Sequence, residues 1–175
     1  MNRKVVLDSF NRKILQELQN AGRLSNVELA ERVGLSPSPC LLRVRQLEDA
    51  GIIRGYVGLV DPEAIGPSLS VFIQVTLERQ SEKTLEVFEK SVAGLPEVME
   101  CYLMTGDADY LLRVVVTDTV ALKDFIIEKL TKTAGVANIR SSFSLKQVKF
   151  KTALPLEQLW PAEETAVGPR RSRRG

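Results

Sequence analysis

The N-terminal fold is decided by residues 24–51, which read LSNVELAERVGLSPSPCLLRVRQLEDAG. Ser25 and Glu28 have the spacing of a capping box, in which each side chain accepts a hydrogen bond from the backbone amide of the other residue. Gly34 is placed to end this helix, because glycine tolerates the left-handed conformation of a C-terminal cap. The pattern predicts a short helix between Ser25 and Gly34.

A second helix follows almost immediately in this stretch. Ser36 is a favourable N-cap, and Pro37 occupies the first helical position, where its missing N–H costs no hydrogen bond. Gly51 is placed to end the helix. The apolar period predicts an inward stripe of Leu41, Val44 and Leu47, with Cys40 at its edge.

The outward face of this second helix is polar and partly basic. Arginine pairs with guanine edges and glutamine with adenine in the major groove, and free backbone amides at a helix start suit a phosphate. The candidate DNA contacts are therefore Ser36, Ser38, Pro39, Leu42, Arg43, Arg45 and Gln46. Either arginine could instead pair with Glu48 or Asp49 on the same helix surface.

One more helix precedes these two. We expect it to begin after Asp8 and to end at Gly22, with a buried face formed by Phe10, Ile14, Leu15 and Leu18. Three short helices in this order match a helix-turn-helix, whose second helix enters the major groove. A plain three-helix packing module is the alternative, because caps and periodicity establish helices and not DNA binding.

Beyond residue 54 the hydrophobic pattern changes. Residues 55–60 predict a strand, and the Pro- and Gly-containing stretch 62–68 predicts a linker. Residues 1–61 are therefore assigned to the first domain and residues 69–154 to the second. Residues 155–175, which hold the cluster Arg170-Arg171-Ser172-Arg173-Arg174, are predicted to be a disordered basic tail that adds non-specific attraction to DNA or is simply solvated.

The second domain alternates strand and helix patterns in the order β-α-β-β-α-β. Strands are predicted over residues 69–77, 98–104, 110–116 and 136–149, with helices after Ser81 and Asp118. This order is the ferredoxin-like arrangement, one sheet with two helices on one face, so the fold class is α+β. Apolar residues on the uncovered face would invite a second copy, and we expect a homo-oligomer.

Composition argues against an enzyme and against a membrane protein. The 175 residues include no histidine, the commonest general base and metal ligand, and we find no phosphate-cradling glycine loop or nucleophile elbow. No apolar run approaches the roughly 18 residues of a membrane span. We expect a cytoplasmic protein without catalytic residues, metal or cofactor. Cys40 and Cys101 fit no disulfide framework and are expected to be buried thiols.

Three segments of the chain resemble the Lrp/AsnC (feast/famine) family of transcriptional regulators. They are LSNVELAERVGLSPSPC at residues 24–40, RVRQLEDAGIIRGY at residues 43–56 and GDADYLL at residues 106–112. The similarity runs from about Leu7 to Phe150. Motifs of this length in this order are far more specific than any short pattern.

The resemblance implies a winged helix-turn-helix in residues 1–61 and a ligand-sensing, oligomerising domain in residues 69–154. It also implies a sequence-specific regulator that binds double-stranded DNA, is associated with the nucleoid, and forms dimers that assemble to tetramers or octamers. The effector that it implies is an amino acid, bound between dimers near the turn at Gly106 and Asp107.

The residues of that turn suggest how an amino acid would be held. Backbone amides of Gly106 and Asp107 could hold the α-carboxylate, while Asp107 or Asp109 could pair with the α-ammonium. The predicted effector-binding set is Leu103, Met104, Thr105, Gly106, Asp107 and Asp109, with Ser142 and Ser144 supplied across an interface. The alternative is a tight turn in which Gly106 and Asp107 serve backbone geometry alone.

Some positions depart from the family pattern. Leu42 and Gln46 stand where relatives often carry glutamate and arginine, and residues 141–144 are less apolar than their equivalent. We therefore expect this chain to have its own operator preference and its own effector. The main alternative function is an architectural protein that wraps DNA without an effector response, and a ligand-binding module without DNA function is a second one.

Overall fold

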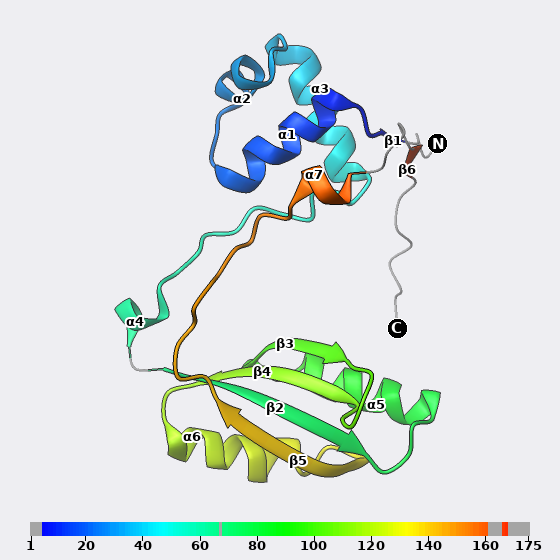
Figure 1. Ribbon diagram of the computed structural model, residues 1–175, viewed down its shortest axis with the longest axis vertical. Coiled ribbons are helices and arrows are strands. Elements are labelled where there is room, and N and C mark those ends of the chain that lie inside the picture. The colour runs from blue at the N-terminus through cyan, green and yellow to red at the C-terminus, as the bar shows by residue number, and fades with distance from the viewer. Residues whose placement is uncertain (1–4, 67, 161–165, 168–175) are drawn as a thin grey trace. The chain divides into compact units, whose positions relative to one another are not determined.

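Two units, each with its own hydrophobic core, make up the computed structural model of the chain (Figure 1). Residues 5–66, 68–160 and 166–167 are described by the structure. The first unit comprises Met1–Leu59 together with Lys149–Gly175, and the second comprises Val60–Val148. The chain therefore leaves the first unit once and returns to it after the second.

Three helices form the N-terminal part of the first unit: α1 (Ser9–Asn20), α2 (Asn26–Val33) and α3 (Pro37–Asp49). The predicted capping box is present, because Ser25 N donates to Glu28 Oε2 at 2.8 Å and Glu28 N donates to Ser25 Oγ at 3.3 Å. Gly34 ends α2 with a φ of 75°, in the left-handed region. The helix-turn-helix expected from the caps is confirmed. The stops predicted at Gly22 and Gly51 each differ by one residue, because the C-caps of α1 and α3 are Ala21 and Ala50.

The core of the first unit forms where the three helices meet. From α3 it receives Cys40 and Leu47, both fully buried, with Val44 packed against them. These residues repeat at helical spacing on one face. Val44 and Leu47 were predicted correctly, but Leu41, which was predicted to point inward, is 38% exposed, and Cys40 takes its place in the core.

The strand predicted over residues 55–60 is wrong. This segment has no ladder partner among the described residues, and Val57 is 82% exposed. A strand needs a neighbour for its backbone amides, and apolar, β-branched residues alone do not supply one. The first unit instead pairs β1 (Val5–Val6) with β6 (Ala166–Val167) in antiparallel fashion.

The second unit is an antiparallel sheet with helices on one face. In chain order it contains β2 (Leu69–Leu77), α5 (Glu82–Ala93), β3 (Val98–Leu103), β4 (Tyr110–Val116), α6 (Thr119–Asp124) with the π-helical turn η1 (Phe125–Leu130), and β5 (Val136–Phe143). The short α4 (Pro62–Ile65) precedes it. The strand order β3-β4-β2-β5 confirms the ferredoxin-like α+β prediction. The last strand ends at Phe143, six residues before the predicted end at Lys149.

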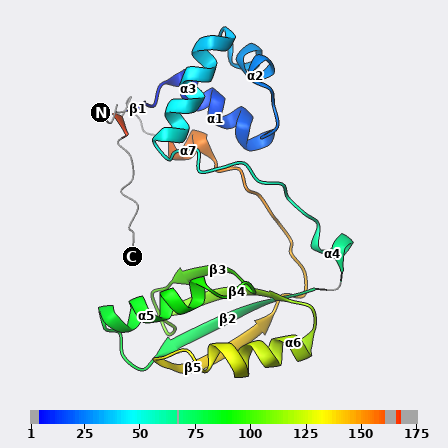
Figure 2. The ribbon, with the colours of Figure 1, turned by 180° about the vertical axis from the view of Figure 1, so that it is seen from behind.

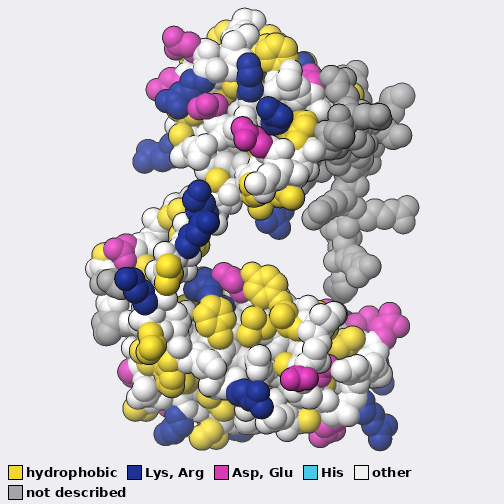
Figure 3. All heavy atoms as spheres, in the orientation of Figure 1, with side chains coloured by type: hydrophobic (Ala, Val, Ile, Leu, Met, Phe, Trp, Pro, Cys, Tyr) yellow, Lys and Arg dark blue, Asp and Glu magenta, His cyan; other side chains and the backbone are white. Residues whose placement is uncertain are grey.

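Alternation along the strands separates a covered face from an open one. Val71, Ile73 and Val75 are buried under the helices, where Phe88 stacks on Tyr110 with ring centroids 4.5 Å apart. Figure 2 shows α5 and α6 in front of the sheet, and the opposite face is turned to the viewer in Figure 1. Hydrophobic side chains are visible over β3 and β4 on that side (Figure 3).

After the second unit the chain returns to the first as an arm, residues 149–160. The arm contains α7 (Leu156–Leu159), and its Trp160 packs against the first core. Leu154 N donates to Gln19 Oε1 at 2.6 Å, and Gln19 Nε2 donates to Leu154 O at 3.4 Å. The structure divides the two units between Val148 and Lys149, whereas the sequence boundary was placed at residue 154. The prediction of disorder is wrong for residues 155–160, which contain α7. The cluster at residues 170–174 lies outside the described residues.

The two cysteines differ in burial. Cys40 is buried as predicted, and burial raises the pKa of its thiol, whereas Cys101 is exposed and that prediction was wrong. Within the described ranges, no helix is long and apolar enough to cross a bilayer. The same residues contain no group of three or more candidate metal ligands.

The docking of the arm makes a testable prediction, because Trp160 is the only tryptophan of the chain. Its emission should be blue-shifted and protected from acrylamide in the native protein. Gln19→Ala removes both hydrogen bonds to Leu154 and should increase quenching, whereas Gln16→Ala, on the same helix and without a side-chain bond to the arm in the described residues, should not. Native emission identical to that in urea would contradict the docking.

Candidate functional site

Most of the predicted DNA contacts lie together on α3. Ser36, Ser38, Pro39, Leu42 and Arg45 are exposed, and Gln46 is half-buried. Leu42 leaves 56% of its surface exposed, a large apolar group at the centre of this face. The exposed face of α3 is thus a compact surface with a cation, hydroxyls and an apolar side chain.

Arg43 is the exception, because its side chain turns toward α1. Its Nη1 lies 2.7 Å from Asp8 Oδ2 and donates to Asn11 Oδ1 at 3.1 Å. The guanidinium carbon lies 5.4 Å from the centre of the Phe10 ring, a cation–π distance. Asp8 also caps α1 by accepting a hydrogen bond from Asn11 N at 2.8 Å. Arg43 therefore braces α3 against the start of α1.

Arg45 has the opposite surroundings. It forms no ion pair with any residue that the structure describes. The alternative partner Glu48 is occupied, because Tyr56 Oη donates to Glu48 Oε1 at 2.9 Å. Burial and this carboxylate raise the pKa of Tyr56 to about 12, so its hydroxyl stays a donor at neutral pH. Of the two arginines, Arg45 is the one whose charge is available to a ligand.

The start of α3 is suited to an anion. Ser36 is its N-cap but makes no side-chain capping bond, so the hydroxyl remains available. The amide of Ser38 lies in the first turn, where helical geometry offers no intrahelical acceptor. Asn26 Nδ2 donates to Pro37 O at 2.8 Å and ties the start of α2 to that of α3. Helix starts of this kind hold phosphates through free amides and the helix dipole.

The predicted effector site is the turn between β3 and β4. Met104 N donates to Asp109 O at 2.8 Å and closes the turn, while Gly106 adopts a φ of 123°, a conformation that favours glycine. Leu103, Met104, Thr105, Gly106 and Asp107 are all exposed. The Asp107 carboxylate accepts no hydrogen bond within the described ranges, so the turn offers backbone amides and one open carboxylate.

The Asp109 carboxylate, unlike that of Asp107, is buried and hydrogen-bonded. The residue is only 6% exposed, Oδ2 accepts from Leu77 N at 2.7 Å, and Oδ1 accepts from Gln80 Nε2 at 2.6 Å. Both oxygens therefore join the start of β4 to the end of β2. This structural role was missed from the sequence, where Asp109 and Asp107 look equivalent.

Ser142 and Ser144 do not meet the turn within one chain. Ser142 pairs with Phe72, and Ser144 N donates to Ser70 O at 2.9 Å, so both lie beside the start of β2. The turn lies beside the end of β2, because Tyr110 pairs with Val75. The two groups thus lie at opposite ends of the sheet and on different edge strands. Only a second chain could bring such serines to the turn.

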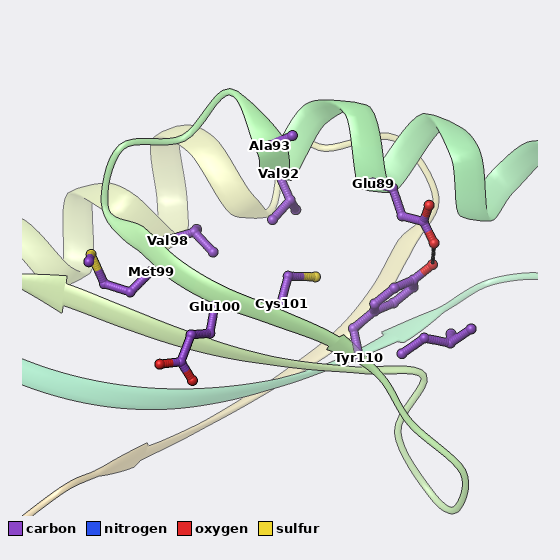
Figure 4. Close-up of a pocket in the computed structure, with 9 residues that line it drawn as sticks. Glu89, Val92, Ala93, Val98, Met99, Glu100, Cys101 and Tyr110 are labelled. Atoms are coloured by element: carbon purple, nitrogen blue, oxygen red, sulfur yellow. Dashed lines mark hydrogen bonds between the residues drawn. The ribbon is translucent and has the colours of Figure 1, made fainter. Parts of the chain in front are cut away.

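Sequence reasoning also missed a pocket of about 330 Å³ between α5 and β3. Its polar end is formed by Tyr110 Oη, which donates to Glu89 Oε1 at 2.9 Å (Figure 4). Leu103 is the one residue of the predicted effector set that lines it. A tyrosine in an apolar strand signals that its hydroxyl needs a partner, but nothing in the sequence identifies Glu89 as that partner.

Two sequence models of known families match the chain. A winged helix-turn-helix DNA-binding domain matches residues 7–54, and the Lrp/AsnC ligand binding domain matches residues 70–154. The first match covers α1 to α3, and the second covers the sheet with its helices and the beginning of the arm.

The chain is also similar to curated relatives and to solved structures over most of its length. The chain is 46% identical over 146 residues to a leucine-responsive regulatory protein of Rhizobium meliloti, covering 83% of this chain and 94% of the relative. It is 47% identical to the Bkd operon transcriptional regulator of Pseudomonas aeruginosa, and the alignment covers 86% of this chain and 98% of that relative.

A transcriptional regulator from Neisseria meningitidis, solved as a complex with L-Met, is 49% identical with a TM-score of 0.81, covering 87% of this chain and 99% of that one. An AsnC family transcriptional regulator from Agrobacterium tumefaciens is 38% identical, also with a TM-score of 0.81 and the same coverage. All four proteins are regulators and not enzymes, in line with the sequence prediction. The chain belongs to the Lrp/AsnC family of transcriptional regulators.

Proposed function

We propose that this regulator reads double-stranded DNA through the exposed face of α3 and that an amino acid bound at the turn 104–109 controls its assembly or DNA affinity. The DNA-binding proposal rests on the different surroundings of two arginines that lie two positions apart on α3. Arg43 is held by Asp8 and Asn11, and Arg45 is free of ion pairs in the described chain.

DNA binding in this proposal uses two parts of α3. The first turn, with Ser36 and Ser38, holds a phosphate and sets the orientation of the helix. Arg45 and Gln46 read base edges, while Leu42 contacts a thymine methyl group. Arg43 contributes indirectly by keeping the helix in place. Association with the nucleoid follows from such binding.

Replacing the two arginines separately tests this assignment. Arg45→Ala should cost about 1–3 kcal/mol of specific binding without loss of stability. Arg43→Ala should lower the free energy of unfolding of the first unit as well, because it leaves Asp8 and Asn11 without their partner. The readouts are fluorescence anisotropy at fixed salt, with an operator selected from random duplexes, and urea unfolding.

The control for this experiment is Arg79→Ala, which makes the same change in net charge on an exposed residue of the second unit. Its operator affinity should equal that of the parent. Equal losses for Arg45→Ala and Arg79→Ala would show that α3 reads no base through Arg45 and that only overall charge matters.

The effector half of the proposal rests on the geometry of the turn. Backbone amides around Gly106 are suited to an α-carboxylate. Asp107 is the carboxylate left to pair with an α-ammonium, because Asp109 is bonded to Leu77 and Gln80. The L-Met complex of the Neisseria meningitidis relative supports an amino acid as the ligand class.

A thermal-shift screen of the twenty amino acids tests the effector. A ligand that binds only the folded protein stabilises it by about 2.7 kcal/mol at about 100 times its Kd. The responding amino acid should lose its effect on Asp107→Asn, whose melting temperature without ligand stays that of the parent. Asp109→Asn should instead melt earlier, because an amide cannot accept both hydrogen bonds as the carboxylate does.

Failure of all twenty amino acids to shift the melting temperature would contradict the effector proposal. It would favour the architectural DNA-wrapping function, which needs no ligand. An unchanged response of Asp107→Asn would move the site away from the turn.

The uncovered face of the sheet is the surface through which we propose that the chain assembles. The uncovered face of the sheet carries Phe72, which is half-exposed, and Leu111 and Val115 occupy the same face by register. We infer that a second copy packs on this face, and that dimers of this kind assemble further so that Ser142 and Ser144 of one chain approach the turn of another. A ligand shifts such assembly only by binding one form more tightly than the other.

A further inference from the structure

We propose that the pocket between α5 and β3 is a second small-molecule site, and that it binds a primary aliphatic ammonium by its charged head and apolar chain. This pocket is not the turn to which the amino-acid effector was assigned. It is lined by the last turns of α5 and by residues of β3, which is an edge strand of the sheet. Figure 4 shows Glu89 and Tyr110 at one end and Met99 at the other.

The polar end of the pocket carries an uncompensated negative charge. Glu89 receives one hydrogen bond, from Tyr110 Oη at 2.9 Å, and no basic side chain lies within ion-pair distance of it in the described part of the chain. Burial and the Glu89 carboxylate raise the pKa of Tyr110, so the phenol remains neutral and keeps the carboxylate in place. One carboxylate oxygen is left to accept from a ligand.

The second carboxylate in the lining is already neutralised. Glu100 Oε1 accepts from Arg113 Nε at 2.9 Å, and Glu100 Oε2 accepts from Tyr102 Oη at 2.9 Å. Both partners share the open face of the sheet with Glu100 by strand register. Glu89 is therefore the group that sets the charge preference of the pocket.

The remaining walls are apolar. Val92 and Ala93 come from α5, and Val98, Met99 and Leu103 come from β3 and its start. The volume of about 330 Å³ is at the small end of ligand pockets, which span roughly 300–1,000 Å³. An ammonium at Glu89 with a chain of about four or five carbons along these walls satisfies both the charge and the apolar surface.

The same features select against anions. The lining includes no lysine or arginine, so a carboxylate would approach Glu89 without a counter-charge. The ligand is thus recognised by its ammonium and its chain. A free amine and an amino acid share that chemistry, and only the amino acid carries the α-carboxylate that the turn would require.

Calorimetry with the full-length protein separates these possibilities. The ligands are 3-methylbutylamine, the uncharged 3-methyl-1-butanol and the anionic 4-methylpentanoate. The amine should bind at least tenfold more tightly than either of the others, which corresponds to one charge-assisted hydrogen bond. Equal affinity for the amine and the alcohol would overturn the proposal. A parallel titration with leucine tests whether an amino acid binds in the same pocket.

Variants of α5 test whether the amine binds in this pocket. Glu89→Gln should weaken amine binding at least tenfold, whereas Glu86→Gln, an exposed carboxylate one turn earlier on α5, should leave it unchanged. Ala93→Phe should fill the pocket and abolish binding. Equal losses for Glu89→Gln and Glu86→Gln would mean a diffuse attraction to an acidic helix and would refute a site.

Alkylation of Cys101 is an independent way to block the pocket, because this thiol lines the pocket and is exposed. Cys40 is buried and should not be labelled. Protein alkylated at Cys101 with N-ethylmaleimide should lose amine binding and keep its amino-acid response if that response belongs to the turn. Undiminished amine binding after alkylation would place the amine elsewhere. Asp107→Asn should leave amine binding intact, so failure of the turn proposal and failure of this one are distinguishable.

Discussion

A single carboxylate, that of Asp8, is the interaction on which the DNA-reading unit depends. It caps α1 through Asn11 N at 2.8 Å and holds the Arg43 guanidinium of α3 at 2.7 Å. These bonds orient α3 about its axis in the same sense as the burial of Cys40 and Leu47. Once Arg43 faces inward, helical geometry places Arg45, two residues later, about 200° around the helix. This contact, together with the burial of Cys40 and Leu47 on the inner side of α3, leaves Arg45 on the exposed face.

In the sensor unit, too, a single carboxylate joins two elements, next to the turn between β3 and β4. Asp109 joins the ends of β2 and β4, and this bonding leaves the neighbouring loop at Gly106 and Asp107 open on a rigid base. Sites supported in this way are held more firmly than sites on free loops. The arm then links the last strand of the sensor back to the first unit, through Gln19 and Trp160. Any change at the sensor thus has a covalent route to the DNA-binding unit through β5.

Local signals in the sequence predicted the helices, the strand order and the motif at residues 24–51, because caps and periodicity are written in neighbouring residues. Contacts between distant residues were not predictable in this way. Arg43 appeared to be a DNA contact because its spacing along α3 says nothing about Asp8, 35 positions away. Asp109, the exposure of Cys101 and the docking of Trp160 depend equally on tertiary neighbours. Residues 55–60 are rich in apolar and β-branched residues like a strand, but their amides find no ladder partner within the described chain.

The central claim, that Asp8 and Arg43 set the orientation of α3, is tested most directly by a double-mutant cycle. Asp8→Asn keeps an N-cap oxygen but removes the charge, and Arg43→Gln removes the guanidinium. Urea unfolding followed by Trp160 fluorescence reports on the first unit alone. A coupling free energy of about 0.5–3 kcal/mol between the two sites is expected for residues in direct contact. Strictly additive effects would contradict the account.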